Sequence, residues 1–178
     1  MDNGRLTDER VWDESWGKMG PRDGGADWNR YERILFEPAA NRILWKRILP
    51  RFLPKGGGQR MIELGSAPGV NLLAWRAHFG YEVFGADFSE TGIAAQRKLF
   101  ARFGIDESHS ISADVLSDEF RRAHAEAYDV VFSGGLIEHF TEPRTMIQVH
   151  LDILKPGGIL VIVVLNIIGI YRRLLSRE

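Results

Sequence analysis

A short loop with glycine at both ends, between a strand-like and a helix-like segment, constrains the fold of this 178-residue chain more than any other feature. Residues 61–64 (MIEL) are apolar apart from an acid near their end, residues 65–69 (GSAPG) form the loop, and a helical pattern begins at Val70. Glycine has no Cβ, so the backbone of such a loop can approach a ligand closely. In open parallel sheets, ligands bind at the carboxyl ends of the strands. The loop therefore predicts where a binding site lies.

Strand-like and helix-like segments alternate from this loop onward. Strands are expected over residues 60–64, 82–86, 109–113, 129–132 and 159–165, and helices over residues 70–79, 89–103, 118–126 and 143–154. Such an alternation is typical of right-handed βαβ units. It predicts an α/β fold, with a doubly wound, mostly parallel sheet and helices on both faces. The last two strands are continuous apolar runs, which indicates burial on both sides.

The first part of the chain has a different character. We expect an N-terminal arm with helices over residues 1–57 and a sheet domain over residues 58–178. A helix is predicted over residues 41–52, because apolar residues there recur every four positions and form one face: Leu44, Ile48 and Phe52.

The arm is rich in large aromatic residues: Trp12, Trp16, Trp28 and Tyr31. These are too many for a free tail, so we expect the arm to pack on the domain. Two interpretations stay open. The arm either forms a lid over a ligand or covers an apolar face of the domain.

Composition excludes several classes of protein. The chain has 23 basic and 24 acidic side chains, so it lacks the basic excess of a nucleic-acid binder, and a small-molecule partner is expected instead. It has no cysteine, which excludes disulfides, thiolate metal sites and a cysteine nucleophile. The polar N-terminus lacks the apolar stretch of a signal peptide, so a cytoplasmic location is expected. The longest apolar run, residues 159–170, is shorter than the roughly 20 residues of a membrane span.

The most apolar strand is expected to come last, over residues 159–165. At a sheet edge it would expose backbone groups that invite pairing. A partner or the C-terminal tail could cover it, or further strands could be missing from the chain, and we favour missing strands. A homodimer through the last strand or the tail is a further expectation.

Three acids close the first three predicted strands: Glu63, Asp87 and Asp114. Parallel strands end at one edge of a sheet, so these carboxylates should lie near each other. Asp87 stands 22 positions (87 − 65) after Gly65, close to the spacing at which a carboxylate binds ribose hydroxyls. Asp114 could accept a hydrogen bond from an exocyclic amine such as adenine N6. Phe88 offers a flat face to a purine, although core packing is an equally good interpretation.

The loop argues against a ligand with a chain of phosphates. A dinucleotide motif, G-x-G-x-x-G, would need glycines where this chain has Ala67 and Val70. A phosphate-binding G-x-x-x-x-G-K-[ST] loop is absent from the sequence. The expected ligand is therefore a nucleoside without such a chain.

These segments resemble the class I (Rossmann-like) S-adenosylmethionine-dependent methyltransferases. The first resemblance is ELGSAPG (63–69) to motif I of that family, commonly (D/E)-x-G-x-G-x-G, with a departure at Ala67. Four more follow in order: VFGADFS (83–89), ADV (113–115), YDVVFS with LIEHF (128–140), and LKPGGIL (154–160). The resemblance covers about residues 58–165.

The resemblance implies S-adenosylmethionine as the cofactor and S-adenosylhomocysteine as the product. The cofactor-binding residues expected from the motifs and the strand ends are Glu63, Gly65, Ser66, Ala67, Gly69, Asp87, Phe88, Asp114, Val115, Ser133 and Gly134. The loop would lie close to the methionine part of the cofactor, and Glu63 would hold either the loop or the cofactor's amino group. Asp87 would bind the ribose, and Asp114 and Val115 would read the adenine. Ser133 and Gly134 would line the floor near the sulfonium.

His139 is the candidate catalytic residue. It follows the fourth strand, where an acceptor would stand, and could take a proton from a hydroxyl or an amine. A structural hydrogen bond is the alternative interpretation. Glu138 and His139 lack a second ligand pair at suitable spacing, so no metal site is expected. The expected reaction is methyl transfer to oxygen or nitrogen of a small molecule, which needs positioning and exclusion of water more than a base.

Two alternatives to this enzyme stay open. Members of the family usually add an antiparallel strand pair after the fifth strand, and the chain has no room for it. A shortened or degenerate cofactor-binding domain without turnover would explain that. A nicotinamide-dependent oxidoreductase on the same layout is disfavoured by Ala67, by Val70 and by the lack of a plausible tyrosine–lysine pair.

Overall fold

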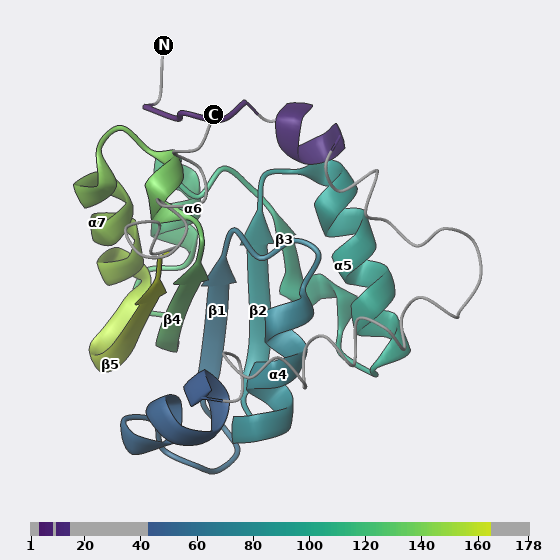
Figure 1. Ribbon diagram of the computed structural model, residues 1–178, viewed down its shortest axis with the longest axis vertical. Helices are drawn as coiled ribbons and strands as arrows, with labels where there is room; N and C mark the ends of the chain where they lie inside the picture. Colours follow the sequence, from purple (N-terminus) through teal and green to yellow (C-terminus); the bar gives the residue numbers. More distant parts are fainter. Residues whose placement is uncertain (1–3, 9, 15–42, 165–178) are drawn as a thin grey trace, which may run out of the picture.

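The computed structural model describes residues 4–8, 10–14 and 43–164. Within these residues, five parallel strands form one sheet in the order β3-β2-β1-β4-β5 (Figure 1). The strands are β1 (Arg60–Leu64), β2 (Glu82–Asp87), β3 (Ser110–Ser112), β4 (Tyr128–Gly134) and β5 (Leu154–Val163). The strand order reverses between β1 and β4, so the loops that follow these two strands diverge there and open a crevice.

Helices cover both faces of the sheet, as Figure 1 shows. They are α4 (Val70–Phe79), α5 (Glu90–Arg102), α6 (Asp118–Ala123) and α7 (Pro143–Ile153). Capping residues mark where these helices begin. The hydroxyls of Ser89 and Ser117 accept from the amides of the third residues of α5 and α6, and Pro143 begins α7. The predicted doubly wound α/β fold is therefore confirmed.

Two apolar clusters hold the layers together. On the side of α4 and α5, the fully buried Trp75 meets four aromatic rings at centroid distances of 5.3–6.1 Å, namely Trp45, Phe79, Tyr81 and Phe132. On the side of α6 and α7, buried residues of β1 and β4 pack against Phe120 and Met146. A sheet packed on both faces gives the ends of its strands a rigid base.

The last strand differs from the prediction. β5 begins at Leu154, and the Pro156-Gly157-Gly158 turn lies inside it as an irregularity in its pairing with β4. Its residues are half-buried or exposed, because β5 is an edge of the sheet formed by the described residues. Burial on both sides is thus confirmed for β4 and wrong for β5.

The segment before the sheet also differs. Residues 41 and 42 of the predicted helix lie outside the described residues, and the rest forms a π-helical turn, η1 (Leu44–Ile48), and a 3₁₀ turn, η2 (Leu49–Arg51). Ile48 and Phe52 of the predicted apolar face are 43% and 68% exposed.

The buried side of this segment lies one position further along the chain. It consists of Trp45, Leu49 and Leu53, each 4% exposed. These residues have the same spacing of four. They form the buried face because the indole of Trp45 packs edge-on against Trp75, with ring centres 5.3 Å apart.

Several expectations concern residues outside the described ranges. Trp16, Trp28, Tyr31 and the tail beyond residue 164 are among them. The division of the chain near residue 57 stays a prediction. In the described ranges, the helices are too short or too polar to cross a bilayer.

Candidate functional site

A cavity of about 250 Å³ lies at the carboxyl end of β1, beside the reversal of the strand order. Its walls come from the loop after β1, the end of β2, the segment after β4 and the N-terminal residues Arg5, Thr7 and Trp12. Figure 1 shows the N-terminal segment, in purple, beyond the strand ends. The glycine loop thus does mark a cavity, as its sequence indicated.

The loop of residues 65–69 is held tightly against β2. The amides of Gly65 and Ser66 both donate to the carbonyl of Ala86, at 2.9 and 3.2 Å. Gly65 has a φ of +69°, and a Cβ there would lie 2.8 Å from Leu136 Cδ1. Gly69 has a φ of +90° and caps α4. Glycine at both ends lets the chain turn sharply below the cavity.

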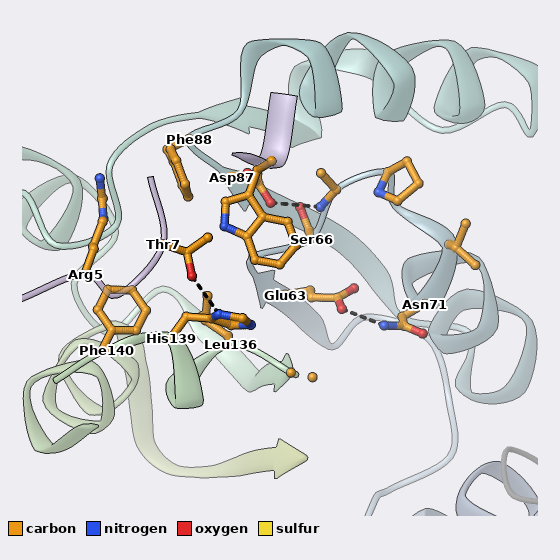
Figure 2. A pocket seen from close by; sticks show the side chains of 17 residues that line it. Arg5, Thr7, Glu63, Ser66, Asn71, Asp87, Phe88, Leu136, His139 and Phe140 are labelled. Atoms are coloured by element: carbon orange, nitrogen blue, oxygen red, sulfur yellow. Dashed lines mark hydrogen bonds between the residues drawn. The ribbon is translucent and has the colours of Figure 1, made fainter. Parts of the chain in front are cut away.

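Glu63 lies in the wall of the cavity with its carboxyl group 1% exposed. Asn71 Nδ2 donates to Oε1 at 2.7 Å, as Figure 2 shows, while Oε2 has no hydrogen-bond partner among the described residues. Burial raises the pKa of Glu63 to about 8, and the hydrogen bond from Asn71 opposes that rise. A buried acceptor with a vacant oxygen suits a cationic donor such as an ammonium group.

Asp87 ends β2 and connects two parts of the site. Its Oδ2 accepts from the amide of Ala67 at 3.1 Å, and its Oδ1 accepts from the amide of Ser89 at 2.9 Å. Burial raises the pKa of Asp87, and these backbone donors oppose the rise. Each carboxylate oxygen has a further lone pair, so Asp87 can still accept hydroxyl groups from a ligand in the cavity.

The third acid is placed differently. Asp114 follows β3 and does not line the cavity; it forms an ion pair with Arg5, which does. Phe88 lines the cavity next to them, and the guanidinium of Arg5 lies 4.6 Å from the centre of its ring. Val115 is buried in the core below.

The end of β4 contributes backbone atoms to the cavity more than side chains. Gly134 lines the cavity, while the hydroxyl of Ser133 is buried on the other side of the strand, 2.9 Å from Nε2 of His150. Burial lowers the pKa of His150, so its ring is neutral. His150 Nδ1 then donates to the carbonyl of Met146 at 2.6 Å, and Nε2 accepts from Ser133. Ser133 therefore fastens β4 to α7.

His139 lines the cavity from η4 (Ile137–His139). Its Nδ1 lies 2.9 Å from the hydroxyl of Thr7, as Figure 2 shows, and its ring meets Trp12 edge-on at 5.0 Å. These contacts from the N-terminal segment fix the orientation of the imidazole. The described residues contain no group of three side chains suited to hold a metal ion.

The cavity also contains residues that the sequence did not single out. Asn71, Leu136 and Phe140 lie next to predicted site residues in the chain or one helical turn away. Arg5 and Thr7 had no such signal, because they reach the cavity only through the path of the N-terminal segment. Of the predicted residues, Gly69, Asp114, Val115 and Ser133 do not line the cavity.

Three comparisons with known proteins bear on this geometry. A family model described as "Methyltransferase domain" matches residues 35–176. A curated "Ubiquinone biosynthesis O-methyltransferase" from Shewanella sp. is 29% identical over 57% of this chain and 41% of its own length. A "Demethylmenaquinone methyltransferase" from Clavibacter sepedonicus is 30% identical over 68% of this chain and 47% of its own length. The chain thus spans less than half the length of these relatives.

Solved structures share the fold. Phosphoethanolamine N-methyltransferase 2 of Haemonchus contortus, in complex with phosphomonomethylethanolamine and S-adenosylhomocysteine, superposes with a TM-score of 0.60 at 25% identity. The superposition covers 82% of this chain and 35% of that one. The same enzyme in complex with S-adenosyl-L-methionine gives a TM-score of 0.61 over 88% of this chain and 35% of its own.

Proposed function

Since this chain belongs to the methyltransferase domain family, we propose that it binds S-adenosylmethionine in the cavity after β1 and transfers the methyl group to a small molecule. One observation carries the proposal: two buried carboxyl groups, Glu63 and Asp87, line one cavity beside a glycine loop at the reversal of the strand order. Solved relatives with S-adenosylmethionine and S-adenosylhomocysteine in complex support the choice of ligand.

The residues present fit that cofactor. The vacant Oε2 of Glu63 would accept the cofactor's ammonium group, which would also stabilise the ionised carboxylate. Asp87 would accept the ribose hydroxyls, and Phe88 would pack on the adenine. Figure 2 places Glu63 and Asn71 at one end of the cavity and Phe88 at the other, with Asp87 between them. This is the order of amino acid, ribose and base in the cofactor.

When bound, S-adenosylmethionine supplies a methyl group already activated on a sulfonium. The protein then has to align the acceptor and exclude water. Leu136 and Phe140 give the cavity an apolar wall on the side of β4. We assign His139 to take the proton released by the acceptor, with Thr7 holding its other ring nitrogen.

The acceptor is proposed to be a small molecule methylated at oxygen, because the curated relatives include enzymes named for ubiquinone biosynthesis O-methylation. Nitrogen is the second candidate, supported by the N-methyltransferase among the structural neighbours.

A second candidate function is cofactor binding without turnover by this chain alone. It is favoured by what the buried carboxyl groups of Glu63 and Asp87 explain, which is the binding of a ligand and not a reaction. A methyl-transfer assay with a panel of phenols and amines separates the two candidates. Binding of S-adenosylhomocysteine with no transfer to any acceptor would favour the binding domain.

The test of the cofactor site is the variant Asp87→Asn, measured by calorimetric titration with S-adenosylhomocysteine. Loss of a charge-assisted acceptor for the ribose should weaken binding by about 1–3 kcal/mol, or roughly 5- to 150-fold. The matched control is Asp118→Asn, an exposed acid on α6, which should leave the affinity unchanged. Equal affinities of wild type and Asp87→Asn would contradict the assignment.

A further inference from the structure

Arg5 touches two of the three residues that the sequence assigned to a purine base. It forms an ion pair with Asp114, and its guanidinium lies 4.6 Å from the centre of the Phe88 ring. Its side chain is 20% exposed and forms part of the cavity wall. Figure 2 shows Arg5 and Phe88 together at the end of the cavity opposite Glu63.

A guanidinium in this position has the chemistry of an adenine edge. Both groups are planar, both pack on an aromatic face, and both donate N–H hydrogen bonds to a carboxylate. Arg5 therefore satisfies Phe88 and Asp114 in the way that an adenine with its exocyclic amine would. On the face of Phe88 that Arg5 covers, the guanidinium and an adenine would compete for the same space.

The segment that carries Arg5 is fastened to the rim of the cavity. We call residues 4–8 the strap. Arg5 pairs with Phe140 in an antiparallel bridge, the amide of Leu6 donates to the carbonyl of His139 at 2.8 Å, and the amide of Thr141 donates to the carbonyl of Gly4 at 2.7 Å. These bonds hold the strap against the segment after β4 and aim Arg5 at the base position.

The fit of Arg5 is nevertheless incomplete. Its Nε is buried and has no hydrogen-bond partner among the described residues. An unpaired buried donor costs free energy, so moving Arg5 out to water would recover part of the cost of breaking its contacts.

We propose that Arg5 is a built-in occupant of the base position and that the side chain must leave before an adenosyl group can bind. The inference rests on the proposed function, because it takes this cavity as the adenosyl site. It adds that the free protein restrains its own cofactor affinity through a contact within the chain.

The size of the restraint follows from the population of the closed form. If Arg5 occupies the base position in roughly 70–90% of molecules, the apparent affinity is reduced roughly 3- to 10-fold. A variant without the guanidinium should regain that loss of affinity. A lysine at position 5 would keep the charge beside Asp114 but lose the planar group over Phe88, so it should restore only part of it.

The experiment is a calorimetric titration of the full chain with S-adenosylhomocysteine, and separately with adenosine. The variants are Arg5→Ala and Arg5→Lys. The matched control is Arg10→Ala, which removes an exposed arginine that pairs with Asp8 in the same N-terminal segment. We expect Arg5→Ala to bind both ligands roughly 3- to 10-fold more tightly, Arg5→Lys to fall between, and Arg10→Ala to match the wild type.

Two outcomes overturn the inference, and they are distinguishable. If the wild type binds S-adenosylhomocysteine and Arg5→Ala binds it equally or more weakly, Arg5 is a neutral or supporting wall of the site and the proposed function stands. If neither the wild type nor Arg5→Ala binds, the proposed function fails and the inference with it.

Discussion

Glu63 places a carboxyl group in the wall of a cavity, where burial raises its pKa to about 8. A carboxyl group in water has a pKa near 4.5. Between about pH 4.5 and 8, the folded protein without ligand therefore holds a proton on Glu63 that the unfolded chain releases. Such a site is poised to ionise when a cation arrives, because the ionised form is then paired.

This protonation gives the stability of the free protein a pH dependence. The pKa of Glu63 is raised on folding, so its contribution is fully present below about pH 4.5 and is lost as the pH rises through about 8. The wild type should lose on the order of 1 kcal/mol per pH unit in that window through this group. Glu63→Gln, which cannot ionise, should show a flatter profile. Urea unfolding at pH 5, 6.5 and 8 measures the difference, and parallel profiles would refute the assignment.

Single residues were predictable where a strand end placed them. Glu63 and Asp87 come at the ends of apolar runs, and parallel pairing brings such positions to one edge. Asp114 was predicted by the same argument, but its partner is Arg5, which lies 109 positions earlier in the chain. No local pattern encodes a contact between a polar N-terminal segment and a strand end, since it depends on the path of the intervening chain.

The loop between β1 and α4 is the element on which the site depends. Its two positive-φ glycines and its bonds to Ala86 fix the backbone under the cavity. Of the two, Gly65 lines the cavity, and a Cβ there would force the side chain of Leu136 to move.

Gly65→Ala should therefore be costly. An alanine at a φ of +69°, with its Cβ 2.8 Å from Leu136 Cδ1, should lower the free energy of unfolding by about 1–3 kcal/mol. Gly57→Ala is the matched control, because a Cβ there meets nothing within 4 Å, and it should change stability by less than about 0.5 kcal/mol. Urea denaturation of the two variants checks this. Equal stabilities would mean that the loop relaxes freely.

Elements were predictable where caps and periodicity agreed. The bounds of β1 and α4 match the expectation, and α5, expected from residue 89, begins at Glu90 with Ser89 as its N-cap. The predicted buried face of the segment around Trp45 is wrong. Two faces of this segment have the same apolar spacing, and only the contact of Trp45 with Trp75 distinguishes them. The predicted start of β5 at residue 159 is wrong, because the sheet accommodates Pro156 and the glycines after it as an irregularity in the strand.

At the scale of the whole molecule, the alternation of elements predicted a parallel sheet but not its strand order. That order follows from which strand pairs with which, and it puts β1 in the centre and opens the crevice between β1 and β4. The balance of charges argues against a nucleic-acid partner. The absence of cysteine excludes disulfides, thiolate metal sites and a cysteine nucleophile. We propose that the point where the strand order reverses holds an adenosyl group and that the strap competes with it for the base position.

The most direct test is a calorimetric titration of the full chain with S-adenosylhomocysteine, beside an identical titration with NADH. The account predicts saturable binding of S-adenosylhomocysteine at one site, with a Kd in the micromolar range, and no saturation with NADH. A folded protein that shows no heat of binding with S-adenosylhomocysteine, or that binds NADH more tightly, would contradict it.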